Sequence, residues 1–143
     1  MNRIEKTADL HQNGGMTCSQ AVLTSFGPKV GIDRSAAKAL GRPLCGINIG
    51  KHGVCGYISG AAIVLGMSRN KDDEAAARKA TTAAVDTLCQ QFKAKHGSLR
   101  CKDLVGADMR TPEGLKAVRE NNLIAKNCYD YGRHVAALLE ELL

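Results

Sequence analysis

The segment from about Leu123 onward constrains the fold most, because its apolar residues recur with helical spacing. Successive members of this stripe are four, three, four, three and four residues apart: Ile124, Cys128, Tyr131, Val135, Leu138 and Leu142. Residues spaced in this way lie on one face of an α-helix, and an apolar face has to be buried against a neighbour. The segment therefore predicts an amphipathic helix that packs against other helices.

A second constraint is the glycine content of the apolar run KHGVCGYISGAAIVLG at residues 51–66. An interior glycine costs a helix about 1 kcal/mol relative to alanine, so a chain that accepts several usually needs close backbone approach there. Gly56 and Gly60 are four residues apart and share one helix face. We expect a helix that extends to about Met67, with a neighbouring helix lying close to these two glycines.

Start and stop signals divide the rest of the chain into helices. Further helices are expected from Asn2 to about Gln12, Thr17 to Gly27-Pro28, Asp33 to Leu40, Asp72 to Lys95, Ser98 to Val105, and onward from Thr111-Pro112-Glu113. Thr17 and Gln20 form a capping-box pattern. Residues 41–53 carry four glycines and a proline, which is typical of a loop. No segment predicts a strand, a repeat or a linker.

Composition supports helices over sheets. Aromatic residues make up 3% of the chain and tryptophan is absent, so the core has to be built from Ala, Leu, Val, Ile and Cys. Strands rely more heavily on aromatic and β-branched residues. A chain of 143 residues fits one domain. The prediction is an all-α, single-domain bundle of six or seven helices over residues 1–143.

The charge pattern argues against two kinds of partner. The net charge of +6 is spread along the chain with no long basic run, and stacking aromatics are few, so nucleic-acid binding is not expected. The longest mostly apolar stretch, Tyr57–Met67, is too short to span a bilayer. The first residues are too polar for a signal peptide. We therefore expect a cytoplasmic protein, in which six cysteines would favour thiol chemistry or metal binding over a disulfide framework.

The cysteines point to chemistry through their placement, since no two form a Cys-x-x-Cys pair. Cys18, Cys55 and Cys101 each fall in the expected first turn of a helix, where free N–H groups favour a thiolate. One helix end lowers a thiol pKa by about one unit, so several converging ends, a cation or a metal would be needed for full ionisation at neutral pH. Cys101 lies between Arg100 and Lys102, which makes it the best single candidate for the reactive thiol.

Packing is the competing explanation for every cysteine, because free cysteine often behaves as a small buried hydrophobe. This explanation is kept for Cys89, on the apolar side of its helix. Among the histidines, His52 is three residues from Cys55 and His96 is five from Cys101, so either could act as a base or ligand. His11 and His134 are expected to be ordinary surface or helix-flank residues.

Four segments together resemble a known family. They are GGMTCSQAVL (14–23), CGYISGAAIVLG (55–66), KHGSLRCKDLVG (95–106) and NCYDYGRHVAALLEELL (127–143). Over residues 14–143 the chain resembles the redox-active proteins named for a C-GCAxxG-C-C cysteine pattern, related to a domain of split-Soret cytochromes. The resemblance implies a small helical domain with four shared cysteines, here Cys18, Cys55, Cys101 and Cys128.

The chain departs from this family pattern at three positions. Tyr57 stands where the motif usually has alanine, and Cys45 and Cys89 are additional. Cys45 lies in the glycine-rich loop ten residues before Cys55, where it could supply a resolving thiol or a ligand. No haem-attachment sequence is present.

These observations leave three hypotheses for function. In the first, two or more of Cys18, Cys55, Cys101 and Cys128 meet and cycle between dithiol and disulfide, with a partner protein or a small-molecule oxidant. In the second, the same four thiolates hold an iron–sulfur cluster or zinc. In the third, the chain is a helical scaffold or partner protein whose cysteines only pack. The glycine-lined faces could serve a homodimer as easily as the core.

Overall fold

The computed structural model describes all residues 1–143 and contains eight α-helices, three short 3₁₀ turns and no strand. The α-helices are α1 (Arg3–Gln12), α2 (Cys18–Phe26), α3 (Arg34–Gly41), α4 (Gly56–Ser68), α5 (Glu74–His96), α6 (Cys101–Val105), α7 (Pro112–Glu120) and α8 (Leu123–Leu142). The 3₁₀ turns are η1 (Gly27–Val30), η2 (Arg42–Leu44) and η3 (Ile49–His52). The all-α prediction is confirmed. The expected total of six or seven helices is slightly too low, since each of the eight segments expected individually forms an α-helix.

The helix starts follow the capping residues, with one exception. Thr17 and Gln20 form the predicted capping box at α2, and Asn2 and Asp33 cap α1 and α3. The sequence predicts that Ser98 caps a helix reaching Val105, but α6 begins three residues after this serine. The reason is a non-local contact, because the backbone before α6 pairs with residues 53–55 in an isolated antiparallel bridge.

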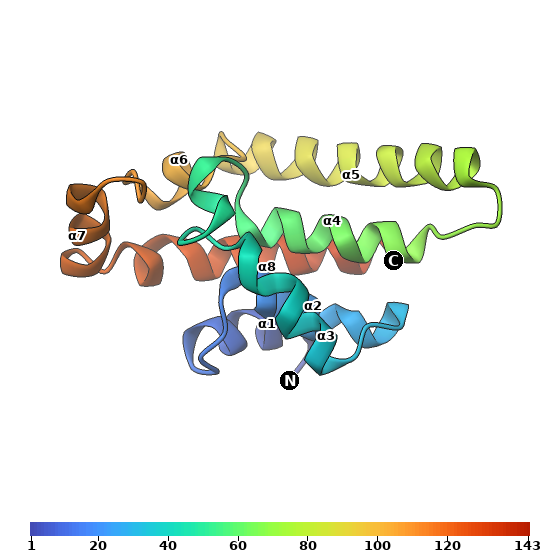
Figure 1. Ribbon diagram of the computed structural model, residues 1–143, viewed down its shortest axis with the longest axis horizontal. Coiled ribbons are helices and arrows are strands. Elements are labelled where there is room, and N and C mark those ends of the chain that lie inside the picture. Colours follow the sequence, from blue (N-terminus) through green and yellow to red (C-terminus); the bar gives the residue numbers. More distant parts are fainter.

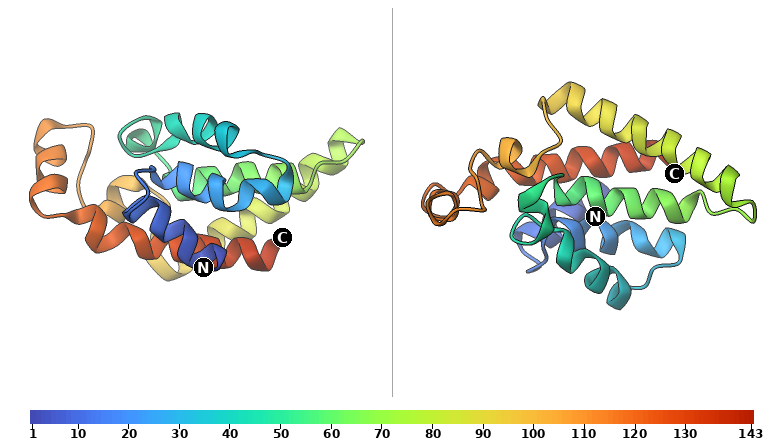
Figure 2. Two further views of the ribbon diagram at one scale, coloured as in Figure 1. Left: turned by 90° about the horizontal axis from the view of Figure 1, so that it is seen from below. Right: turned by 45° about the horizontal axis from the view of Figure 1, so that its top comes forward.

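The helices pack around α4 and α8. In Figure 1, α5 lies along one side of α4, α8 runs beside α4, and α1, α2 and α3 cover the opposite side. Figure 2 shows α7 projecting beyond the rest of the bundle. The predicted stripe of α8 is confirmed, with Cys128, Val135 and Leu138 buried in the core. α4 is the most apolar helix, yet no helix combines the length and apolarity needed to cross a membrane.

The predicted close approach at Gly56 and Gly60 is confirmed. A Cβ at Gly60 would lie 2.5 Å from Cγ1 of Val22 and 3.1 Å from the carbonyl oxygen of Ser19, both on α2. The first separation is shorter than real Cβ contacts and the second is tight, so a larger residue at Gly60 would force Val22 or the spacing of α2 and α4 to shift. The two helices therefore bring Cys18, at the start of α2, beside the start of α4.

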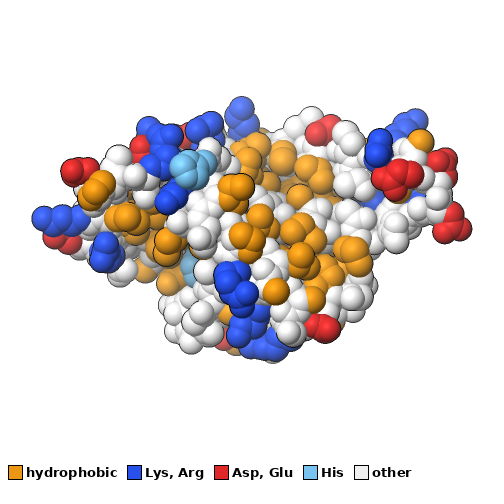
Figure 3. Space-filling view, in the orientation of Figure 1, with side chains coloured by type: hydrophobic (Ala, Val, Ile, Leu, Met, Phe, Trp, Pro, Cys, Tyr) orange, Lys and Arg blue, Asp and Glu red, His pale blue; other side chains and the backbone are white.

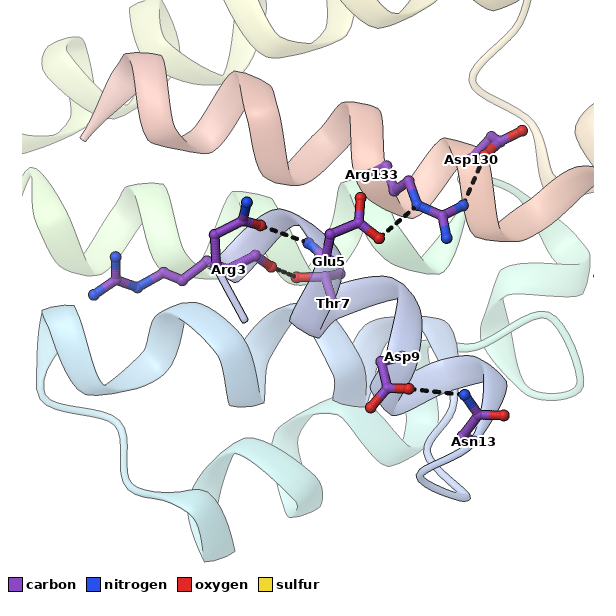
Figure 4. A network of polar contacts seen from close by, with 8 residues as sticks. Arg3, Glu5, Thr7, Asp9, Asn13, Asp130 and Arg133 are labelled. Atoms are coloured by element: carbon purple, nitrogen blue, oxygen red, sulfur yellow. Dashed lines mark hydrogen bonds and ion pairs between the residues drawn. The ribbon is translucent and has the colours of Figure 1, made fainter.

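Polar contacts hold α1 against α8. Arg133 on α8 donates to Glu5 at 3.2 Å and to Asp130 at 2.8 Å (Figure 4). Arg3 on α1 donates to Glu140 on α8 at 3.5 Å. These pairs are solvent-exposed, and such pairs each contribute about 0–1 kcal/mol. Their effect on the site is positional, because they orient the helix that carries His11.

Candidate functional site

A cavity of about 250 Å³ lies where the ends of α1, α2, α4, α6 and α8 converge. Five of the six cysteines line it: Cys18, Cys45, Cys55, Cys101 and Cys128. The structure thus brings together all four cysteines singled out from the sequence and adds Cys45 from the glycine-rich loop. Cys89 does not line the cavity and packs partly buried against the core. All six cysteines are free thiols.

A backbone bridge aligns Cys55 with Cys101. Cys55 N–H donates to the carbonyl of Leu99 at 2.8 Å, and Cys101 N–H donates to the carbonyl of Gly53 at 3.0 Å. Between these bonds, Val54 pairs with Arg100. Side chains alternate along extended backbone, so Val54 and Arg100 point to one side and the two cysteines to the other. This explains why Val54 is 42% exposed, whereas both thiols line the cavity.

Two Cys-Gly pairs make room for thiols from distant segments. Gly56 follows Cys55, and a Cβ there would lie 2.5 Å from Cys18 Sγ. Gly46 follows Cys45, and a Cβ there would lie 2.8 Å from Cys101 Sγ. At Gly56 the sulfur of Cys18 fills the space that a side chain would take, and at Gly46 the sulfur of Cys101 shares it with Cε of Met109, which would lie 2.4 Å from the Cβ. The sequence therefore places Cys18 beside the Cys55 segment and Cys101 beside the Cys45 segment.

Burial keeps these thiols protonated. It raises the pKa of Cys101 and of Cys128 to about 12, and the charge of Cys55 adds to both shifts. Burial also raises the pKa of Cys18 well above its ordinary value. The expectation that cations beside Cys101 would favour its thiolate is wrong, because Arg100 and Lys102 are exposed and neither lines the cavity.

Cys55 differs from the other thiols in its contacts with backbone amides. It occupies the N-cap position of α4. Burial raises its pKa, but the N–H groups of Tyr57 and Ile58 act in the opposite direction because they can donate to its thiolate. Among the cavity thiols whose pKa shifts, only Cys55 has such amide donors. When Cys55 is ionised, the negative charge of its thiolate raises the pKa of Cys18, of Cys101 and of Cys128. Cys55 is therefore the one thiol that interacts electrostatically with each of the other three.

A buried pair at the wall of the cavity, His11 and Tyr57, was not expected from the sequence. Nδ1 of His11 lies 2.5 Å from Oη of Tyr57, and both residues line the cavity. Burial lowers the pKa of His11 to about 4, so the ring is neutral at neutral pH, and in the tautomer protonated at Nε2 its Nδ1 can accept from the tyrosine hydroxyl. Gly132 on α8 makes room for the Tyr57 ring, since a Cβ there would lie 2.6 Å from Cζ. No local pattern links these three positions, so no signal in the sequence could have predicted the pair.

The other histidines lie elsewhere. His52 is exposed on η3 and does not line the cavity. His96, the second candidate base, lies on α5, where its Nε2 is 2.9 Å from Nδ1 of His134 on α8. The two rings pack around Phe92 in an aromatic cluster that also includes Tyr131. Neither His96 nor His134 lines the cavity.

The donor set of the cavity bears on whether it could hold a zinc or iron–sulfur centre. Thiolates are the usual donors to both, so the residues match such a centre in kind. However, no group of three or more His, Cys, Asp or Glu side chains is arranged so that it could hold a metal ion. As placed, these side chains therefore do not form a metal site.

The contact between Gly56 and Cys18 leads to a stability prediction. Gly56→Ala should lower the free energy of unfolding by about 1–3 kcal/mol, because its Cβ would overlap Cys18 Sγ. In a Cys18→Ala background the same substitution should cost clearly less, because the overlapping sulfur is gone. Urea unfolding of the four proteins in this double-mutant cycle measures the coupling between the two positions.

Gly60→Ala is the matched control, because it lies one turn further along the same helix face. Its Cβ would meet Val22 and Ser19, not Cys18. The loss of stability caused by Gly60→Ala should therefore be the same with or without Cys18. Equal costs of Gly56→Ala in both backgrounds would contradict the packing described here.

Comparison with known families agrees with this picture of converging cysteines. Residues 16–142 match the model of the family described as "Putative redox-active protein (C_GCAxxG_C_C)". No curated protein and no solved structure gives a match. The matched range includes all five cysteines of the cavity. The chain therefore belongs to the C_GCAxxG_C_C family of redox-active proteins.

Proposed function

We propose that this protein carries out thiol–disulfide exchange in the cysteine-lined cavity. The observation that carries the proposal is the convergence of five free thiols from separate segments on one cavity, with Cys55 at the amide-rich start of α4. Family membership supports a redox role in general. The local contacts favour Cys55 as the attacking thiol and Cys18 as the resolving thiol.

The exchange has two steps. Cys55 loses its proton, and its thiolate attacks one sulfur of a substrate disulfide, which forms a mixed disulfide and releases the first substrate thiolate. Cys18 Sγ lies against Gly56, next to Cys55, so its thiolate can attack Cys55 Sγ. That attack forms a Cys18–Cys55 disulfide and releases the second substrate thiolate. The two protons given up by the cysteines match the two taken up by the products, and the protein dithiol is oxidised as the substrate disulfide is reduced.

Cys101 and Cys128 lie on the same cavity and interact with the charge of Cys55. Either can accept the disulfide from Cys55 by a further exchange, which would move the oxidised pair without adding or removing electrons. Because burial raises the thiol pKa values, only a small fraction is ionised at neutral pH. The rate of exchange should therefore rise as pH increases above neutrality.

Anaerobic purification followed by thiol titration and elemental analysis tests the proposal. The reduced chain should be colourless, contain its six thiols and carry no stoichiometric metal. An excess of a small disulfide should lower the titre by about two per chain, reversibly, with Cys55 in the new bond and Cys89 outside it. Stoichiometric zinc, or iron with visible absorbance, would instead support a metal module. Thiols that resist labelling until the chain is denatured would support a scaffold with packing cysteines.

A further inference from the structure

Exposed apolar side chains lie on the segment that borders the cavity, and cations lie on and beside that segment. Ile47 is 63% exposed and also lines the cavity, Ile49 is 62% exposed, and Val54 is 42% exposed. All three belong to the segment between η2 and α4, which also carries Cys45 and Cys55. Large aliphatic side chains this exposed cost solvation free energy unless a partner covers them.

Four exposed or half-buried cations lie on or beside this segment and at the start of α6: Arg42, Lys51, Arg100 and Lys102. Backbone and side-chain contacts connect three of them to the cavity segment. The backbone carbonyl of Arg42 accepts a hydrogen bond from the side chain of Asn48. Lys51 is part of η3, and Arg100 pairs with Val54 in the backbone bridge. None of the four takes part in an ion pair. We call these cations, together with Ile47, Ile49 and Val54, the mouth surface.

Few carboxylates offset this positive charge. Asp103 accepts from Ser98, and Asp108 is paired with Arg110 through two hydrogen bonds. In Figure 3 one group of basic side chains lies near α6 and another over α3 and η2, with apolar side chains and no acidic ones between them, and further basic side chains lie over α7 and near the loop before α5. The acidic side chains in that view gather mainly at the far end of the α4 and α5 pair. The mouth surface therefore combines unpaired positive charge with exposed apolar area on the outer side of the segments that carry Cys45, Cys55 and Cys101.

From this juxtaposition we propose that the mouth surface docks an acidic polypeptide whose disulfide is reduced in the cavity, an inference that rests on the proposed exchange activity. Charge complementarity speeds the encounter of two surfaces, and the exposed aliphatic side chains supply the apolar contact at its centre. Positive charge around a cavity also raises the local concentration of an anionic substrate. A basic polypeptide with the same disulfide gains neither advantage.

Two synthetic peptide disulfides and one uncharged disulfide test this inference. Each peptide is a symmetric disulfide of a short chain with leucine beside its cysteine, flanked either by glutamates or by lysines. Bis(2-hydroxyethyl) disulfide is the uncharged probe. At low ionic strength the reduced protein should react about tenfold or more faster with the acidic peptide than with the basic one, after each peptide's own reactivity toward free cysteine is divided out. The ratio should fall toward one in ~1 M salt, where the Debye length is about 3 Å.

Charge-reversal variants locate the effect. Arg42→Glu/Arg100→Glu should abolish or invert the acidic preference. Lys71→Glu/Lys79→Glu changes the net charge by the same amount at exposed, unpaired lysines on the loop before α5 and on α5 itself, and should keep it. An equal loss in both variants would mean that net charge, and not the mouth surface, sets the preference, and would overturn the inference. A wild type that reduces the uncharged disulfide but shows no acidic preference would also overturn it. A wild type that does not reduce the uncharged disulfide would overturn the exchange activity itself.

Discussion

Replacing Cys55 with serine should slow the reduction of a small disulfide by about 100-fold or more while leaving the fold intact. The loss follows because the proposed attacking sulfur is gone, and because Cys18, Cys101 and Cys128 have no comparable amide donors to favour their thiolates. The rate of thiol loss with bis(2-hydroxyethyl) disulfide under anaerobic conditions measures the effect.

The fold should tolerate this change because Cys55 is the N-cap residue of α4. Serine is among the preferred N-cap residues, since its hydroxyl accepts from the second or third N–H of a helix. The amides of Tyr57 and Ile58, which favour the thiolate of Cys55, are the ones that a serine hydroxyl would satisfy. Cys55→Ser should therefore unfold at the same urea concentration as the wild type or a slightly higher one.

Cys89→Ser is the control, because Cys89 lies outside the cavity. It should keep the rate of disulfide reduction within about twofold of the wild-type value, as expected for a residue away from the site. If Cys55→Ser still cycled at the wild-type rate, the attacking thiol would have to be another cavity cysteine, and the assignment of roles here would be wrong. Mapping the oxidised pair in that variant would identify the cysteine.

Acidification from pH 7 to pH 4 should destabilise the protein through His11. Its pKa is about 4 in the folded chain and about 6.5 when unfolded, so between these values the unfolded state binds more protons. The contribution is fully present above pH 6.5 and is lost as pH falls toward 4. A separation of about 2.5 units corresponds to at most roughly 3 kcal/mol. Urea unfolding at several pH values gives the slope.

His11→Asn isolates this effect, because the asparagine amide oxygen can still accept from Tyr57 but does not titrate. Its unfolding free energy should change less between pH 7 and pH 4 than that of the wild type. Burial also lowers the pKa of His96 and His134, so part of the slope should remain in the variant. An unchanged slope in His11→Asn would show that the ring is not buried as described.

The helices were predictable from sequence because their signals are local. The capping residues Asn2, Thr17 and Asp33 and the stripe of α8 marked the elements to within a few residues. The start of α6 was not predictable in the same way. Ser98 looks like a cap, but the N–H of Cys101 is committed to Gly53, which is far away in the sequence. Long-range backbone pairing outweighed the local capping preference.

The placement of three cysteines at expected helix starts suggested that the cysteines converge. The number of residues between them, with no Cys-x-x-Cys pair, carried no such information. Helix starts and the family resemblance singled out Cys18, Cys55, Cys101 and Cys128. The participation of Cys45 and His11 depends on how α1 and the loop before α4 pack, which no local pattern encodes. The electrostatics also differed from expectation. A helix end lowers a thiol pKa by about one unit, whereas burial in an apolar cavity shifts it further in the opposite direction.

The two Cys-Gly pairs have a consequence for how the chain matures. The space beside Gly56 and Gly46 that holds a sulfur forms only when segments more than thirty residues apart in the sequence have come together. Before that, the six thiols are solvent-accessible groups of ordinary acidity, open to indiscriminate oxidation. Completion of the bundle buries four of them, leaves Cys18 and Cys89 partly exposed, and raises the pKa of most of the cavity thiols. Alkylation of most thiols by iodoacetamide should therefore slow as tertiary structure forms, while Cys55 stays reactive in the folded chain, so that the newly synthesised chain gains protection from random crosslinking as it acquires its selective reactivity.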